Sequence, residues 1–346
     1  MKTNYYDGTK LLSLLDINGK KPEIYMCVTN RTAGKTTFFG RMMIRRFLKE
    51  GKKFALLYRF NYELDDIPEK FFGELGPRWF PNKEMSMKKV CRGAFVELFL
   101  NDIPCGYGVS LNNAEQVKKY SHYFSDVDAI LMDEFQSSSN KYCPGEIRKF
   151  IIIHTSMARG YGQQSRYLPV YMLSNALSIL NPYYGEFNIA VRLRKDTKFL
   201  KGTGFVLEQT INESAKEAAN QSAFLQAFAG HREVRSANEN IYLDDNRAFI
   251  AQPSGRSRYI CTLLYLGKNY GIREYGQQGF LFCGTTFDKT HKEKIAITTE
   301  DHQINYVMLQ RNSFLLGVLR DLFQKGCFRF QNLLCKEAII RALSFK

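Results

Sequence analysis

Several features that often indicate a function are missing from this chain of 346 residues. None of its eight cysteines forms a Cys-x-x-Cys pair, and no histidine stands at zinc-ligand spacing from two of them, so we predict reduced thiols and no zinc site. The first residues lack the apolar core of a signal peptide, and no apolar run approaches the length of a membrane span. Internal repeats and low-complexity linkers are absent as well. We therefore expect a cytosolic globular protein with no membrane partner.

Acidic residues are scarce relative to basic ones. The chain has 49 Lys and Arg against 34 Asp and Glu, a formal net charge of +15, and residues 231–346 still carry 17 basic against 11 acidic residues. Because the excess is spread along the chain, it indicates a broadly basic surface that favours a polyanionic partner, most simply nucleic acid, although charge also serves solubility alone. With 45% hydrophobic residues, the chain can bury a core, and its length allows two domains.

A Gly-Lys-Thr loop between a strand and a helix is the most informative motif. The apolar run 24–28 predicts a strand, and residues 35–50 predict a helix that Gly51 ends. Residues 29–36 between them have the pattern of a phosphate-binding P-loop, although Thr29 stands where that pattern has glycine. Backbone N–H groups would hold the β-phosphate, Lys35 would reach the β- and γ-phosphates, and Thr36 would bind Mg²⁺. The residues expected to bind ATP are Thr29, Asn30, Arg31, Thr32, Ala33, Gly34, Lys35, Thr36 and Thr37.

A second apolar run ends in two acids. Residues 127–133 predict a buried parallel strand that delivers Asp133 and Glu134 to the carboxyl edge of a sheet. In a P-loop ATPase the first acid holds Mg²⁺ with its water shell, and the second polarises the attacking water. An adjacent Asp-Glu pair favours an additional-strand ATPase over a small-molecule kinase.

Strand-like and helix-like segments alternate along the first two thirds of the chain, which predicts a mainly parallel α/β sheet. Further strands are expected at 54–59 and 169–175, and a further helix at 145–158. An Ala/Glu/Gln-rich stretch, 209–230, reads as helix and is the best linker candidate. Strands at 259–266 and 279–283 followed by a mainly helical end, 306–345, predict a separate C-terminal domain. We expect domains over 1–205 and 231–346, joined by a helical linker or lid over 206–230.

These residues together resemble the DNA-packaging (encapsidation) ATPases of small tailed podophages, which are related to terminase large subunits. The order and spacing of the markers match over about residues 20–185 and again over 302–346. The markers are Arg31-Thr32-Ala33-Gly34-Lys35-Thr36, Tyr58-Arg59, Tyr62-Glu63-Leu64, Met132-Asp133-Glu134-Phe135, Leu173-Ser174-Asn175-Ala176, Asn181-Pro182-Tyr183, and Phe328-Arg329-Phe330 with Asn332.

The resemblance implies a ring-forming motor, usually a homopentamer, that hydrolyses ATP with Mg²⁺ to move double-stranded DNA into an empty capsid. Its partners would be the DNA, the capsid portal and, in some relatives, a structural RNA. Such a motor would work in the host cytoplasm, transiently on the viral procapsid. The implied fold is an N-terminal P-loop additional-strand ATPase domain and a C-terminal ribonuclease-H-like α/β domain.

Residue roles follow from the same resemblance. Asp133 and Glu134 match the Mg²⁺-binding and water-activating acids, beside the phosphate lysine Lys35. Ser174 and Asn175 match the segment that senses the γ-phosphate and couples hydrolysis to movement. Arg159 matches the arginine that reaches a neighbouring subunit's site, where a guanidinium neutralises charge on the phosphoryl group. The competing positions are Arg166, in the same loop, and Lys118 or Lys119. An arginine that binds DNA or a surface carboxylate is the other reading of Arg159.

The C-terminal domain is expected to lack nuclease activity. Nuclease chemistry on a ribonuclease-H-like fold needs acids that converge on two metal ions, one of them on the first strand. The expected first strand, 259–266, has no acid. The acids nearby, none of which lies inside an apolar strand, are Asp244, Asp245, Asp288, Glu300 and Asp301. We therefore predict a vestigial nuclease that contacts DNA, the portal or a structural RNA.

Two other functions stay open from the residues alone. A P-loop small-molecule kinase or nucleotide-regulated enzyme would be monomeric and unaffected by DNA. A nucleic-acid scaffold with a purely structural P-loop would be unchanged by Glu134→Gln. For the motor, the basic stretch 83–92 is the predicted contact with DNA phosphates, which would be bound without regard to sequence.

Overall fold

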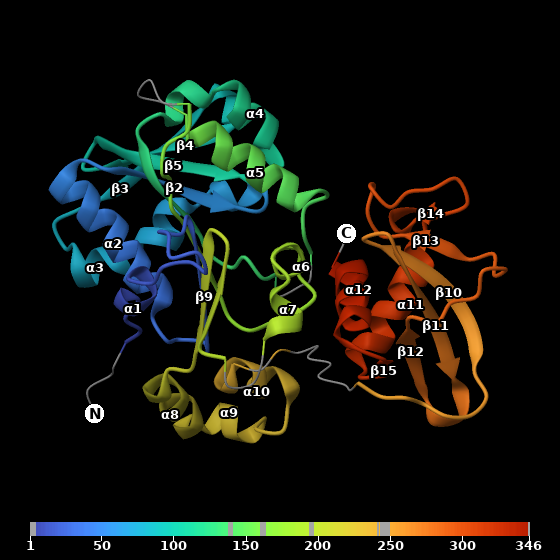
Figure 1. Cartoon of the computed structure of the whole chain (residues 1–346). Coiled ribbons are helices and arrows are strands. Elements are labelled where there is room, and N and C mark those ends of the chain that lie inside the picture. The colour runs from blue at the N-terminus through green and yellow to red at the C-terminus, as the bar shows by residue number, and fades with distance from the viewer. Residues whose placement is uncertain are drawn as a thin grey trace. The chain divides into compact units, whose positions relative to one another are not determined.

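The computed structural model describes residues 5–137, 141–159, 164–193, 197–240, 242 and 250–344. The chain forms two compact units, one from residues 1–176 and 196–241 and the other from 177–195 and 242–346 (Figure 1). None of the helices in the described ranges has the length and apolar character to cross a membrane.

The first unit is built on a nine-stranded sheet in the order β3-β4-β5-β2-β6-β7-β1-β9-β8. Its six inner strands, β5 through β9 in that order, run parallel, and antiparallel pairing adds the strands at both edges. The strands are β1 (Ile24–Thr29), β2 (Lys53–Tyr58), β3 (Met85–Val90), β4 (Phe95–Leu100), β5 (Ile103–Ser110), β6 (Val127–Met132), β7 (Val170–Ser174), β8 (Phe199–Gly202) and β9 (Phe205–Thr210). The helices are α1 (Thr9–Leu12), α2 (Lys35–Glu50), α3 (Leu75–Trp79), α4 (Ala114–Lys119), α5 (Glu146–Met157), α8 (Glu213–Gln221), α9 (Ala223–Ala227) and α10 (Arg232–Glu239).

Strand β7 lies between β1, which leads into the P-loop, and β6, which ends in the two acids. One strand therefore separates the two motifs, which is the additional-strand arrangement expected from the adjacent acids. The predicted helix 35–50 is confirmed as α2, and the predicted helix 145–158 is α5 with one residue fewer at each end. Gly51 ends α2 with φ +68° and donates its N–H to Phe47 O, as a C′ glycine does.

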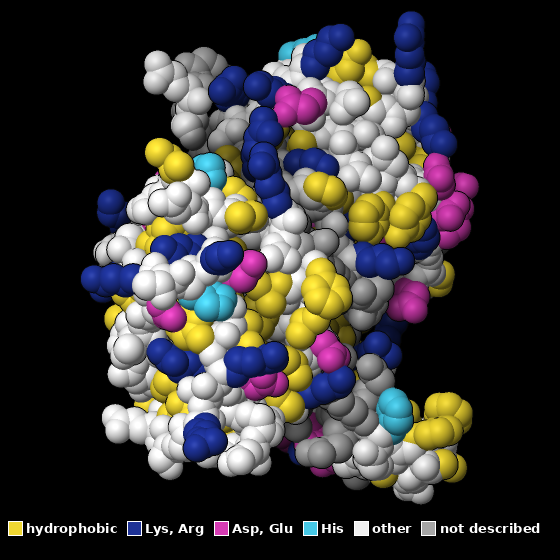
Figure 2. Space-filling model, turned by 90° about the vertical axis from the view of Figure 1, so that its right-hand side faces the viewer, with side chains coloured by type: hydrophobic (Ala, Val, Ile, Leu, Met, Phe, Trp, Pro, Cys, Tyr) yellow, Lys and Arg dark blue, Asp and Glu magenta, His cyan; other side chains and the backbone are white. Residues whose placement is uncertain are grey.

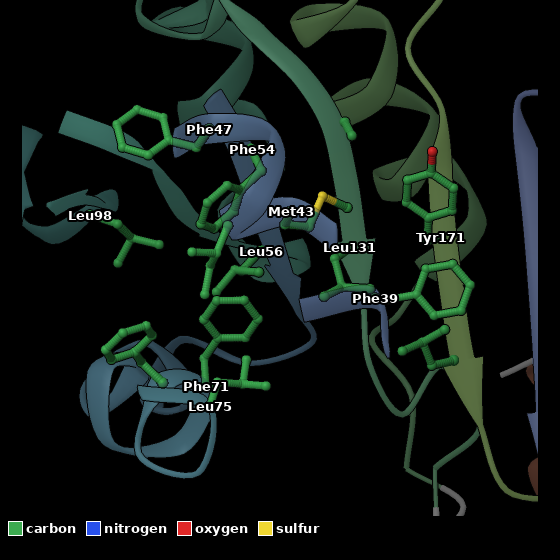
Figure 3. Packing of buried hydrophobic residues seen from close by; sticks show 14 of the residues in the cluster. Phe39, Met43, Phe47, Phe54, Leu56, Phe71, Leu75, Leu98, Leu131 and Tyr171 are labelled. Carbon is green, nitrogen blue, oxygen red and sulfur yellow. The ribbon is translucent and has the colours of Figure 1, made fainter. Parts of the chain in front are cut away.

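Helix α2 fixes the P-loop to the sheet through an apolar stripe (Figure 3). Phe39, Met43 and Phe47 recur every fourth residue and so share one face of the helix. They face strands β2, β6 and β7, and the Phe39 and Tyr171 ring centroids lie 5.2 Å apart. Each such side chain contributes about 1.5–3 kcal/mol by its burial, so the first turn of α2 is held firmly against the sheet.

The second unit has a six-stranded sheet in the order β14-β13-β10-β11-β12-β15. Strands β10, β11 and β12 form an antiparallel meander, and β13 then pairs in parallel with β10. Three antiparallel strands followed by a parallel strand on the far side of the first is the predicted ribonuclease-H-like arrangement. The elements are β10 (Arg258–Tyr265), β11 (Lys268–Tyr275), β12 (Phe280–Gly284), β13 (Lys294–Ala296), β14 (Val307–Met308), β15 (Phe328–Phe330), α6 (Pro182–Glu186), α7 (Ile189–Arg192), α11 (Ser313–Gln324) and α12 (Leu333–Ser344).

The boundaries of the two units differ from the domain boundaries expected at residues 205 and 231. Strand β9 begins at Phe205 and pairs with β1 from Ile24↔Phe205 to Thr29↔Thr210, so the sheet of the first unit continues past the expected boundary. Residues 177–195, with α6 and α7, group with the C-terminal unit instead. The expected helical linker, 206–230, contains most of β9 and then two separate helices, α8 and α9. Long-range strand pairing, which a local pattern does not show, accounts for the difference.

Candidate nucleotide site

The loop between β1 and α2 has the backbone of a phosphate-binding loop. Thr29 pairs with Thr210 as the last residue of β1, so it keeps extended backbone at the position where the motif has glycine. Gly34 has φ +94°, and a Cβ there would meet the Tyr5 ring at 2.8 Å, so glycine is required on both counts. Helix α2 begins at the next residue, and its first N–H groups have no partner inside the helix. They are available to an anion, as the P-loop pattern predicts.

Side chains from three strand ends meet at the carboxyl edge of the first sheet. Lys35 Nζ donates to Asn175 Oδ1 at 2.6 Å, beyond the end of β7. Thr36 Oγ1 donates to Asp133 Oδ2 at 2.8 Å, beyond the end of β6. The second Asp133 oxygen accepts the Glu134 N–H at 2.9 Å. The structure thus brings together the predicted lysine, hydroxyl, acids and coupling asparagine.

Burial and neighbouring charge shift the pKa of two groups in the site. Lys35 is 8% exposed, and burial lowers its pKa while Asp133 acts in the opposite direction. Burial raises the pKa of Glu134, and the charges of Asp133 and Glu63 add to the rise. A carboxylate with a raised pKa accepts a proton more readily near neutral pH. Glu134 also has φ +56°, an uncommon conformation for a residue with a Cβ, and such strain is found more often at functional sites.

Thr36 and Asp133 provide the hard oxygen donors that suit Mg²⁺. Their hydroxyl and carboxylate oxygens lie 2.8 Å apart. Mg²⁺ in a nucleotide site takes one or two protein oxygens and fills its other positions with phosphate oxygens and water. The donor set therefore fits an ion that binds together with a nucleotide.

Arg59, just beyond β2, braces the loop that carries Glu134. Its Nε lies 3.0 Å and 3.2 Å from the two carboxylate oxygens of Glu146, and its terminal nitrogens donate to Phe135 O at 2.8 Å and to Glu134 O at 3.3 Å. Both partners of the ion pair are buried, with 7% of the Arg59 side chain and 1% of the Glu146 side chain exposed. The predicted strand 54–59 ends at Arg59, but no sequence pattern gives this arginine a partner. Glu146 was missed, because no local pattern shows which acid will meet an arginine 87 residues away.

The segment from β9 to α10 backs the P-loop. Asn30 donates from Nδ2 to Asn212 O at 3.1 Å and accepts the Asn212 N–H at 2.8 Å. The Arg31 N–H donates to Ala237 O, in α10, at 3.0 Å. These bonds hold two expected ATP-binding residues by their amide and backbone groups. Asn212, within the expected linker, and Ala237, beyond it, therefore both lie beside the P-loop.

The candidate trans-acting residues differ in how their own chain holds them. Arg159 is exposed and lies two residues beyond α5, while residues 160–163 fall outside the described residues. Helix α5 begins at Glu146, beside Arg59, and its 12 residues span about 18 Å, so Arg159 lies at the end remote from its own Glu134. Arg166 instead donates to Met157 O at 2.8 Å. Lys119 is exposed in the last turn of α4.

Asp301 and Asp288, two of the acids considered for a nuclease site, bind backbone and hydroxyl groups rather than each other. Asp301 is 7% exposed, and its oxygens accept the N–H groups of Leu266 and Gly267 at 2.8 Å each. Asp288 accepts the N–H and the hydroxyl of Thr290, and Glu300 is exposed. Asp244 and Asp245 lie outside the described residues. Over the described ranges, no three His, Cys, Asp or Glu side chains are placed to hold a metal ion.

Known proteins share both the sequence and the fold. A profile of the podovirus DNA encapsidation protein (Gp16) family matches residues 1–344. The DNA packaging protein of Bacillus phage phi29 is 23% identical over 335 residues, which cover 96% of this chain and 94% of that protein. The DNA packaging protein of Bacillus phage B103 is 24% identical over 310 residues, covering 88% and 92%.

Two solved structures have a similar fold. A chain of the bacteriophage Phi-29 viral genome packaging motor assembly matches with a TM-score of 0.56 and 23% identity, covering 96% of each chain. The Phi-28 gp11 DNA packaging motor matches with a TM-score of 0.64 and 17% identity, covering 100% and 99%. The family profile spans nearly the whole chain and the site has the parts of a P-loop ATPase, so the chain belongs to the podovirus DNA encapsidation protein (Gp16) family, the DNA-packaging ATPases of these phages.

Proposed function

We propose that this chain is the subunit of a ring, expected to be a homopentamer, that hydrolyses ATP to translocate double-stranded DNA through the portal into a preformed capsid. The observation that carries the proposal is the meeting of Lys35, Thr36 and Asp133 at one sheet edge, in a member of a DNA encapsidation family. Lysine and arginine side chains are spread over the face in Figure 2 rather than gathered in one patch. A broadly basic surface suits a protein that works against a polyanion.

Each side chain of the site has a task in phosphoryl transfer. The β-phosphate of ATP would bind the N–H groups of the P-loop, with Mg²⁺ held by Thr36 and Asp133. Glu134 would polarise the attacking water and accept its proton, for which a raised pKa is suited. Lys35 would turn from Asn175 to the β- and γ-phosphates, which frees the Asn175 amide to sense the γ-phosphate. Binding of ATP would thereby change the position of the loop that follows Ser174.

The trans-acting arginine is proposed to be Arg159. Its place at the far end of α5 puts it out of reach of its own Glu134 and leaves it exposed to a neighbouring subunit. Arg166 is less suited, because its guanidinium is held by carbonyl oxygens of its own chain, Met157 O among them. A guanidinium supplied by the neighbour would make hydrolysis depend on ring assembly.

The second unit is proposed to bind DNA, the portal or a structural RNA, without cleaving nucleic acid. Its buried acid, Asp301, already accepts two backbone N–H groups and the Thr298 hydroxyl, so little of its carboxylate is left for a metal ion. The DNA contact in the first unit is proposed at residues 83–92, which form β3 and the turn after it. Lys88 is exposed there, and Lys89 pairs with Asp65 at 2.8 Å.

The first experiment is ATP hydrolysis by the purified protein, alone and with portal-bearing capsids, each with and without double-stranded DNA. We expect turnover that rises with DNA of any sequence and disappears in Glu134→Gln, which should still bind ATP. An assembled wild-type complex that binds ATP but does not hydrolyse it would contradict the proposal and favour a scaffold. A monomer whose turnover ignores DNA and capsids would favour the small-molecule kinase.

The trans arrangement and the missing nuclease need separate tests. Arg159→Ala subunits mixed with Glu134→Gln subunits should recover turnover, because each variant supplies what the other lacks. Normal hydrolysis by a ring made only of Arg159→Ala subunits would show that the assignment is wrong. For the second unit, Mg²⁺- or Mn²⁺-dependent cleavage of plasmid by the purified protein would contradict the absence of nuclease activity.

A further inference from the structure

The chain leaves the first unit for the second at two places, and one hydrogen bond joins them. The first crossing follows Ala176, and the second follows residue 241. The Ala176 N–H donates to the side-chain oxygen Oδ1 of Asn240 at 3.2 Å. Ala176 is the last residue of the first unit before one crossing. It is therefore bound to Asn240, the next-to-last residue of that unit before the other crossing. We refer to this bond as the crossing bond.

Asn240 also holds two other strand ends at the same sheet edge. Its Nδ2 donates to Thr210 O at 3.3 Å, at the end of β9, and to Val28 O at 3.4 Å, in β1. The residue is 6% exposed, so its side-chain amide is largely shielded from water. Its φ is +52°, a conformation that asparagine tolerates and that glycine adopts freely. The nitrogen of this side-chain amide thus binds near the ends of β1 and β9, and its oxygen binds the segment just beyond β7.

The crossing bond is one residue away from the nucleotide site. Asn175, whose Oδ1 accepts from Lys35 Nζ at 2.6 Å, directly precedes Ala176. Helix α10, which leads to Asn240, meets the P-loop through Ala237 O and the Arg31 N–H at 3.0 Å. A shift of Asn175 when Lys35 turns to a phosphate would move the Ala176 N–H. That movement would change the hydrogen bond to Asn240 directly, because the side-chain oxygen of Asn240 accepts the Ala176 N–H.

We propose that Asn240 is a positioning residue that couples the occupancy of the nucleotide site to two of the three chain connections between the units, those after residues 176 and 241. The inference rests on the proposed function, because it names how ATP turnover by that site would reach the C-terminal unit. Asn240 acts through Asn175 and Ala176. Removal of the Asn240 side chain should therefore leave the phosphate-binding groups in place. It should reduce the DNA-stimulated turnover of ATP.

Two substitutions separate the role of the Asn240 side-chain oxygen from that of its N–H groups. Asn240→Gly keeps a backbone that accepts positive φ and removes all three side-chain bonds. Asn240→Asp keeps an oxygen for the Ala176 N–H but has no N–H for Val28 O and Thr210 O. The matched control is Asn188→Gly, since Asn188 has φ +51°, is exposed and makes no side-chain capping bond to α7.

The assays are ATP binding and DNA-stimulated turnover of the full-length protein on portal-bearing capsids. For Asn240→Gly we expect turnover to fall about tenfold with the ATP dissociation constant within about twofold of wild type, a loss typical of coupling between sites. Asn240→Asp should keep more turnover than Asn240→Gly, and Asn188→Gly should match wild type. Unchanged turnover in Asn240→Gly, or equal losses of binding and turnover, would overturn the inference.

Hydrogen exchange of the Ala176 amide tests the crossing bond without relying on turnover. In nucleotide-free protein the exchange should be faster in Asn240→Gly than in wild type or Asn240→Asp. A non-hydrolysable ATP analogue should change it in wild type only. If wild type fails to hydrolyse ATP while the analogue still alters Ala176 exchange, the proposed function fails and the coupling stands. Equal exchange in wild type and Asn240→Gly would show that the bond does not form.

Discussion

The acid pair Asp133 and Glu134 in the first unit and Asp301 in the second unit use their carboxylates in opposite ways. At the carboxyl edge of the first sheet, Asp133 binds the Thr36 hydroxyl, and Glu134 beside it has a pKa raised by burial and by Asp133. In the second unit, Asp301 binds the N–H groups of Leu266 and Gly267. Burial acts to raise the pKa of Asp301. The hydrogen bonds that its carboxylate accepts lower the pKa by more, so the net shift is downward.

The difference shows how an acid is placed for chemistry or for structure. A carboxylate that accepts several N–H and O–H groups is held in its charged form and has few lone pairs to spare. Asp301 is in that position, so it fixes the turn after β10. A carboxylate that is partly desolvated beside a second acid instead gains a proton more easily and keeps its oxygens available. Glu134 is in that second position, which predicts that the two units will respond differently when their acids are changed.

The largest effect is expected from Glu134→Gln. The substitution keeps the size of the side chain but removes the base, so ATP turnover should fall about 10³-fold, within the range for a general base. ATP binding should stay near that of wild type, because Lys35 and the P-loop are untouched. Steady-state hydrolysis and nucleotide titration measure the two quantities. Glu300→Gln, at an exposed acid of the second unit, is the matched control and should hydrolyse ATP normally. Equal turnover in both variants would remove the distinction between the sheets.

The next effect is on the stability of the first unit. Arg59→Ala leaves the buried Glu146 carboxylate without its cation, which should lower the free energy of unfolding by about 3–5 kcal/mol. Urea unfolding followed by circular dichroism measures the change. In the double variant Arg59→Met, Glu146→Leu, both charges are gone, so the loss should be smaller than in Arg59→Ala. A single variant that costs less than the double variant would show that the ion pair does not brace the Glu134 loop.

The P-loop and two long-range residue pairs show what the sequence can and cannot predict. The P-loop, the helix after it and the two acids were predicted because each is a continuous pattern of strand, loop and helix. Arg59 with Glu146, 87 residues apart, and Ala176 with Asn240, 64 residues apart, were not predicted. Such pairs meet only because the sheet order places their strand ends side by side. The sheet order itself depends on long-range pairing, such as that of β9 with β1, which has no local sequence signal.

A smaller effect is expected from Asp301. Asp301→Ala leaves the N–H groups of Leu266 and Gly267 without an acceptor, which should cost about 1–3 kcal/mol. Because the folded pKa of Asp301 is lowered, its contribution is present above the unfolded value of about 3.9 and is lost as the pH falls through the folded pKa. Urea unfolding at pH 7 and at acid pH should show wild type approaching Asp301→Ala as the pH falls.

Turnover gives the second half of that test. ATP hydrolysis by Asp301→Ala should equal that of wild type wherever both are folded, because the substitution lies in the second unit. A difference in stability that does not shrink at acid pH would contradict the structural role of the carboxylate. A loss of turnover in a folded protein would show that this acid acts beyond its own turn.

The smallest expected effect is a shift in the pH profile of the first unit. Desolvation is the largest cause of the raised pKa of Glu134. The negative charge of Asp133 is the next largest cause, and the charge of Glu63 follows. The acid limb of kcat/KM for ATP, which reports the free enzyme, should therefore lie above the ordinary pKa of glutamate. Glu63→Gln keeps an oxygen for the Phe60 N–H and removes the charge, so the limb should move to lower pH. Glu69→Gln, at an exposed acid nearby in the chain, should leave the limb where it is. If both variants keep the wild-type limb, the charge of Glu63 does not reach Glu134, and burial with Asp133 alone tunes the base.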